Sequence, residues 1–199
     1  MACLLSLGMQ AQSVFRFVQL TDLHLSPNNP NPTEDLLRSV AQINATDNID
    51  FVLVTGDITE EGDRASMEKV KSCLDLLKVK YYVALGNHET KWSDSGCTAF
   101  GEIFGSERFE FEHKGFLFLG FNSGPLMRMA YGHVVPQDIR WMTERMEQAG
   151  KDKPVILVSH YPMKDGDVDN WYEVTDAVRP FNVRLFIGGH YHANQVHHY

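Results

Sequence analysis

Residues 51–57 read FVLVTGD, and this short stretch decides the fold class of the chain. Its first part, Phe51 to Thr55, is a continuous run of apolar and β-branched residues, which predicts a strand. Such runs are typical of strands buried on both faces in the parallel sheets of α/β proteins. Asp57 follows at the carboxyl end of the strand, where ligands bind in folds of this class.

Further apolar runs on both sides of this stretch predict the rest of the sheet structure. The additional strands that we expect are Val14–Leu20, Lys80–Leu85, Pro154–Ser159 and Arg184–Ile187. A β-rich segment from Arg108 to Asn122 is broken at Lys114-Gly115, which predicts a hairpin.

Three helical patterns lie between these strands. The first has Thr33 as its expected N-cap, and the third begins near Pro136 and ends at Gly150. Their apolar faces consist of Leu36, Leu37, Val40 and Ile43, of Val70, Cys73, Leu74 and Leu77, and of Ile139, Met142 and Met146. Strands that alternate with helices predict an α/β fold in which the buried strands run largely parallel.

The composition indicates a globular domain and excludes several classes of protein. The 199 residues carry a formal net charge of -8, so a basic surface for duplex nucleic acid is not expected. No apolar run reaches the roughly 18 residues that a transmembrane helix needs. Cys3, Cys73 and Cys97 form no CxxC motif, which argues against a cysteine zinc ribbon and a disulfide framework. The composition leaves the oligomeric state open.

The first 13 residues, MACLLSLGMQAQS, differ from the rest of the chain. They are apolar and uncharged, and the small residues around Ala11 offer a cleavage position for signal peptidase. We therefore expect residues 1–13 to be a signal peptide or a disordered leader, and residues 14–199 to form the folded domain. A signal peptide predicts export to the periplasm or the extracellular space. A cytoplasmic location is the alternative, because a positively charged start is missing.

Each of the best strand candidates ends in residues that can bind metal. The five segments are Asp22-Leu23-His24, Thr55-Gly56-Asp57, Gly86-Asn87-His88-Glu89, Ser159-His160 and Gly189-His190-Tyr191-His192. Imidazole and carboxylate ligands together favour transition metals, whereas calcium and magnesium sites consist almost entirely of oxygen atoms. These side chains are too many for one tetrahedral site. Two metals about 3.5–4 Å apart, with a bridging carboxylate, explain them better.

In this order, the five motifs resemble the signature of the calcineurin-like metallophosphoesterase family, over roughly Phe15 to His192. The resemblance implies an α/β fold in which two β-sheets form a sandwich flanked by helices, an αββα arrangement. It also implies a role for each site residue. Asp22, His24 and His192 would hold one metal, Asn87, His160 and His190 would hold the second, Asp57 would bridge them, and His88 would face the phosphate.

The activity implied by this resemblance is hydrolysis of phosphomonoesters or phosphodiesters by a hydroxide that bridges two metals. The ions would be divalent or mixed-valence Mn, Fe or Zn, which the residues do not distinguish. Asp57 and His88 would be the catalytic residues, with His88 stabilising the transition state or protonating the leaving oxygen. Glu89 would orient a neighbouring imidazole, and a solvated loop carboxylate is the alternative for it.

The expected substrate is a small phosphoester or a nucleotide, because the motifs also resemble those of bacterial cyclic-nucleotide phosphodiesterases. Aromatic residues close to the motifs could stack on a nucleobase or an aryl leaving group, although packing explains them more readily. These residues are Trp92, Tyr161, Trp171 and Tyr172.

Two other classes of function are open from the sequence. A non-catalytic, metal-containing protein-interaction module could use the same fold, but such proteins typically lose ligands that are present here. A structural zinc site would need a closed Cys/His set, and the motifs contain no cysteine. Members of the family usually have further strands after the last motif. Only seven residues follow His192, so we expect the domain to be incomplete at its C-terminus.

Overall fold

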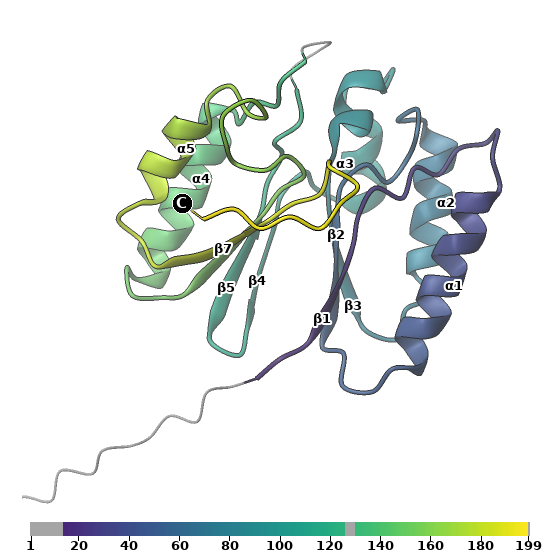
Figure 1. The fold of residues 1–199 in the computed structure, drawn as a ribbon, viewed down its shortest axis with the longest axis horizontal. Helices are drawn as coiled ribbons and strands as arrows, with labels where there is room; N and C mark the ends of the chain where they lie inside the picture. The colour runs from purple at the N-terminus through teal and green to yellow at the C-terminus, as the bar shows by residue number, and fades with distance from the viewer. Residues whose placement is uncertain (1–13, 126–129, 199) are drawn as a thin grey trace, which may run out of the picture.

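The computed structural model describes residues 14–125 and 130–198, and Figure 1 shows two sheets with helices on their outer faces. This arrangement confirms the predicted αββα sandwich. Residues 1–13 lie outside the described residues, so the leader and export stay predictions. Within the described ranges, no helix is long and apolar enough to cross a membrane.

The first sheet is entirely parallel and is covered by helices on one side (Figure 1). Its strands are, in spatial order, β1 (Phe17–Leu20), β2 (Phe51–Thr55) and β3 (Lys80–Ala84). The helices that cover it are α1 (Asn31–Ala45), α2 (Arg64–Leu74) and α3 (Thr98–Phe104).

The second sheet contains one antiparallel pair and is covered on its outer face by two helices. Its strands are β4 (Phe109–His113), β5 (Phe116–Gly120), β6 (Val155–Val158) and β7 (Val183–Ile187). The covering helices are α4 (Pro136–Ala149) and α5 (Trp171–Val178). β4 and β5 form the predicted hairpin around Lys114-Gly115, and the other strand pairs are parallel.

Side chains alternate along β2, and this alternation places the strand between two apolar layers. Phe51 and Leu53 point into the space between the sheets, where they pack with Phe118 of β5. Val52 and Val54 point the other way and belong to the layer beneath α1 and α2. Because both faces are covered, all five residues of β2 are buried. This double burial is the physical reason for the continuous apolar run in the sequence.

Several helices differ from the sequence prediction. α1 begins at Asn31 with Pro32 in its first turn, so the predicted N-cap at Thr33 is wrong. Leu37 is 39% exposed and does not belong to the buried face of α1. α3, α5 and the π-helical turn η1 (His88–Trp92) have no counterpart among the predicted helices. These segments are too short to show a clear helical period.

The parallel strands bring the five motifs to one edge of the sandwich. The loops after β1, β2, β3, β6 and β7 each carry one motif, and the yellow segment after β7 crosses towards the first sheet in Figure 1. The fold therefore gathers residues that are up to 170 positions apart, from Asp22 to His192, around the ends of both sheets.

Candidate metal centre

Most of the predicted metal ligands have a backbone conformation that residues other than glycine rarely adopt. Five of them have positive φ angles, namely Asp22 (53°), His24 (48°), Asp57 (47°), His190 (76°) and His192 (51°). Each such residue costs roughly 1–3 kcal/mol, and strained residues of this kind cluster at functional sites. The strain coincides with the strand ends, where the chain turns towards the centre.

One group of candidate ligands joins the loop after β1 to the loop after β7. The Nε2 atoms of His24 and His192 are 3.2 Å apart, and Nε2 of His192 lies 3.3 Å from Oδ1 of Asp22. One ligand atom from each of the three residues lies within 4.8 Å of the other two. The structure thus brings together the three residues predicted to hold the first metal.

A second group surrounds Asp57 on its other side. Nε2 of His160 lies 3.1 Å from Oδ2 of Asp57, and a ring nitrogen of His190 lies within 4.8 Å of both. Asp57 also forms a group with His24 and His88. Nε2 of His88 lies 3.8 Å from Oδ2 of Asp57. Asp57 therefore lies between the two groups, the position expected for a bridging ligand.

The histidines of the centre are oriented through their Nδ1 atoms. Nδ1 of His160 lies 2.7 Å from the carbonyl oxygen of Thr55, and Nδ1 of His24 lies 2.9 Å from Oε2 of Glu60. Nδ1 of His88 contacts the carbonyl oxygen of Glu60. His160 and His88 can each donate Nδ1–H to a carbonyl oxygen, which leaves Nε2 for a metal or a substrate, whereas Nδ1 of His24 is within ion-pair distance of Glu60 without a hydrogen bond. Glu60 was missed in the sequence, where its only signal is its place three residues after Asp57.

Burial and neighbouring charges shift the pKa values of four proposed ligands. Burial lowers the pKa of His24 and of His190 despite the neighbouring carboxylates, so both imidazoles are neutral and can act as ligands. Burial opposes ionisation of Asp57. The contact with His160 outweighs this effect and lowers the pKa of Asp57, which stays a carboxylate. The same contact raises the pKa of His160 despite its burial, so a metal bound there would displace a proton from His160.

Asn87 supplies a direct test of whether a metal fits here. Its Oδ1 atom is buried and has no hydrogen-bond partner among the residues that the structure describes. A buried carbonyl oxygen without a partner is unfavourable by about 1–3 kcal/mol, and a cation would satisfy it. The donors together are imidazole nitrogens, carboxylate oxygens and one amide oxygen, a set that suits first-row transition metals. The residues present therefore fit the predicted metals.

Two glycines allow the loops to approach one another this closely. A Cβ atom on Gly86 would lie 2.1 Å from Oδ1 of Asp57, and one on Gly189 would lie 2.0 Å from the hydroxyl oxygen of Thr21. Thr21 donates a hydrogen bond of 2.6 Å to Oδ2 of Asp22. The glycines in the motifs are thus required by contact with the ligand residues themselves.

Glu89 does not orient an imidazole, so this prediction is wrong, and neither is it a solvated loop carboxylate. It is fully buried and accepts hydrogen bonds from the N–H of Thr59 (2.9 Å), the hydroxyl of Thr59 (2.8 Å) and the N–H of Gly86 (2.9 Å). Its role is to tie the loop after β2 to the loop after β3. These loops carry Asp57 and Asn87.

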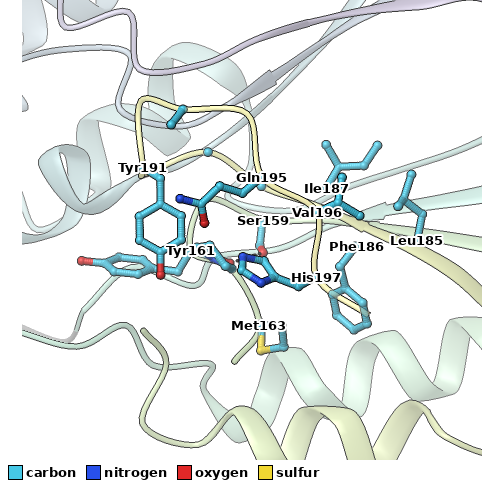
Figure 2. Close-up of a pocket in the computed structure, with 14 residues that line it drawn as sticks. Ser159, Tyr161, Met163, Leu185, Phe186, Ile187, Tyr191, Gln195, Val196 and His197 are labelled. Atoms are coloured by element: carbon cyan, nitrogen blue, oxygen red, sulfur yellow. Dashed lines mark hydrogen bonds between the residues drawn. The ribbon is translucent and has the colours of Figure 1, made fainter. Parts of the chain in front are cut away.

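Two tyrosines support the loop that carries His190. The rings of Tyr161 and His190 have centroids 4.1 Å apart, and Tyr161 is 4% exposed. Tyr191 donates a hydrogen bond to Asp167, and Figure 2 shows both tyrosines beside a cavity of about 160 Å³ under this loop. Tyr161 therefore packs in the interior, as the simpler of its two sequence explanations predicts.

Comparison with known proteins agrees with this geometry. Residues 15–194 match the family described as calcineurin-like phosphoesterase. An uncharacterized protein of Bacillus subtilis is 28% identical over 166 residues, which are 73% of this chain and 13% of that protein. A 3′,5′-cyclic-nucleotide phosphodiesterase of Nostoc is 22% identical over 189 residues, which are 87% of this chain and 70% of that protein.

A solved structure gives the same result for the fold. The purple acid phosphatase from seeds of yellow lupin (Lupinus luteus) superposes with a TM-score of 0.61 at 15% sequence identity. The match covers 90% of this chain and 38% of the lupin chain, so this chain corresponds to only part of that protein. The motifs, the sandwich and the match over residues 15–194 agree, and the chain belongs to the calcineurin-like phosphoesterase family.

Proposed function

We propose that this chain hydrolyses phosphoesters with two metal ions held at the candidate metal centre. The observation that carries the proposal is that Asp57 belongs to two groups of converging ligand atoms, one with His160 and His190 and one with His24 and His88. His24 in turn belongs to the group of Asp22 and His192. Overlapping groups of this kind favour two neighbouring ions over one.

Each side chain has a part in this proposal. Asp22, His24 and His192 would hold one ion, Asn87, His160 and His190 would hold the other, and Asp57 would be shared by both. When bound, the two ions lower the pKa of a water molecule to provide the nucleophile, and they neutralise charge on the phosphoryl oxygens. Mn, Fe and Zn all suit the donor set.

His88 is the residue best placed to act on the phosphoryl group itself. Its ring lies beside Asp57 and is held at Nδ1 by the carbonyl oxygen of Glu60, so Nε2 stays free to face the substrate. As an imidazolium, His88 donates a hydrogen bond from Nε2 to the phosphoryl oxygens and passes its proton to the leaving oxygen. Glu60 thereby positions both His24 and His88.

The proposed substrates are small phosphomonoesters or phosphodiesters, including nucleotides. The Nostoc relative is named a cyclic-nucleotide phosphodiesterase, which supports a diester. The lupin neighbour is a phosphatase, but at its low identity it supports the fold alone. No observation favours a non-catalytic interaction module, because every ligand residue of the motifs is present.

The test is hydrolysis of p-nitrophenyl phosphate and bis-p-nitrophenyl phosphate by protein stripped of metal and then given Mn, Zn or Fe. Metal should restore turnover, and Asp57→Asn and His88→Ala should each abolish most of it. His113→Ala is the matched control, because His113 lies at the end of β4 near Asp50 rather than at the centre. Absence of turnover with every metal, from folded and metal-loaded protein, would refute the proposal. Equal turnover by the His113 and His88 variants would refute the role of His88.

A further inference from the structure

An exposed tryptophan lies beside the candidate metal centre and has no part in the chemistry described so far. The π-helical turn η1 begins at His88 and ends at Trp92, so both side chains are carried by the same short segment. The centroids of their rings are 6.5 Å apart. Trp92 is 50% exposed, which is unusual for so large an apolar side chain and leaves part of the indole open to a ligand.

Trp92 lines a groove of about 950 Å³ that runs between the ends of the two sheets. One wall is η1 and the loop that follows it, and the other consists of the loops before β4 and after β5 and the start of α4. Pockets of this volume accept molecules the size of a nucleotide. The groove thus offers room for the part of a substrate that extends past His88.

The polar side chains that line this groove are largely engaged with one another. Arg108 pairs with Asp138 and lies over the ring of Trp141, 5.4 Å from its centroid. Asn122 donates a hydrogen bond of 3.0 Å to Glu107. Among the other lining residues, the indole of Trp92 can stack on an aromatic ring and the ammonium of Lys91 can attract an anion, while Asp94 adds one negative charge to the same wall.

Lys91 places a positive charge next to the indole of Trp92. Its Nζ atom lies 5.0 Å from the centroid of the Trp92 ring, on the same turn η1. A cation near an indole helps to hold the ring in place and attracts anionic ligands. An aromatic ring beside a positive charge is suited to a nucleotide or an aryl phosphate, and offers little to a small alkyl group.

We infer that Trp92 selects phosphodiesters that carry an aromatic ring, a nucleobase or an aryl group, by stacking on that ring next to His88. The inference rests on the proposed function and goes beyond it, because the metal centre itself acts only on the phosphoryl group. It assigns the preference for an aromatic substituent to one side chain outside the motifs.

The experiment compares three diesters in the metal-loaded protein. Bis-p-nitrophenyl phosphate and 3′,5′-cyclic AMP carry aromatic rings, and glycerophosphoethanolamine carries only alkyl groups. For Trp92→Ala we expect kcat/KM to fall about tenfold on the aromatic substrates and to change less than about twofold on the alkyl substrate. Trp92→Phe should keep most of the activity on both. Tyr172→Ala is the control, because Tyr172 is exposed to a similar extent (52%) but lies on α5 outside the groove.

Binding gives a second measurement that does not depend on turnover. Trp92→Ala should weaken binding of adenosine 5′-monophosphate about tenfold and leave binding of glycerol 3-phosphate unchanged. Equal losses on aromatic and alkyl ligands, or no loss on either, would overturn the inference while leaving the proposed function intact. If the unmodified protein hydrolyses none of the diesters, the inference fails, whereas the proposed function fails only if p-nitrophenyl phosphate is not hydrolysed either.

Discussion

The hydrogen bonds of Glu89 give the sharpest prediction about stability. This buried carboxylate accepts from two backbone N–H groups, those of Thr59 and Gly86, and from the Thr59 hydroxyl. Glu89→Ala leaves both N–H groups buried without a partner, at about 1–3 kcal/mol each, and adds a cavity. We therefore expect the free energy of unfolding to fall by about 4 kcal/mol. This is a large share of the roughly 5–15 kcal/mol that stabilises a typical domain.

Glu89→Gln separates the hydrogen bonds from the volume of the side chain. The glutamine oxygen can still accept from both groups of Thr59, but its NH2 group then faces the N–H of Gly86. Only one donor loses its partner, so we expect a loss of about 1–3 kcal/mol, clearly smaller than for alanine.

The measurement is urea denaturation of the metal-free protein, followed by circular dichroism. Glu102→Gln is the matched control, because Glu102 is an exposed residue of α3 that pairs with Arg64. Surface pairs of this kind contribute at most about 1 kcal/mol. If Glu89→Ala destabilises the protein no more than the control does, or if alanine and glutamine have the same effect, the structural role assigned to Glu89 is wrong.

Three further predictions concern other parts of the molecule. The N–H of Arg16 and the ammonium of Lys114 lower the pKa of Asp50 to about 2. The ionised Asp50 therefore stabilises the folded protein above about pH 4, and this contribution is lost as the pH falls towards 2. Asp50→Asn should remove this part of the acid dependence of the urea midpoint. Gly189→Ala should displace the hydroxyl of Thr21, destabilise the protein by about 1–3 kcal/mol and weaken Mn binding measured by calorimetry. Mn at about 100 times its Kd should raise the free energy of unfolding by about 2.7 kcal/mol for each of the two sites, and chelation should reverse this.

The sequence predicts the sheets, and the edge at which the candidate ligands gather, for one common reason. In β2, burial on both faces requires every residue to be apolar, so the strand is visible as a run from Phe51 to Thr55. Parallel strands then end at one edge, so a motif such as Gly56-Asp57 identifies the site as well as the strand. The residues that the sequence misses act through contacts that have no local pattern. Glu60 and Glu89 are ordinary acidic residues until the fold places them against His24, Thr59 and Gly86.

The strained conformations at the strand ends raise the question of what holds these loops in place. Backbone hydrogen bonds continue the pairing of β1 and β2 beyond their ends, since the N–H of Asp22 donates to Gly56 (3.1 Å) and that of His24 to Asp57 (3.0 Å). The N–H of His190 donates to the side-chain carboxylate of Asp22 (3.2 Å). Each bond ties one ligand-bearing loop to another, so the left-handed residues are fixed by the sheet framework and by one another. The fold thus prepares the centre before any metal binds, and metal binding should add stability without being required for folding.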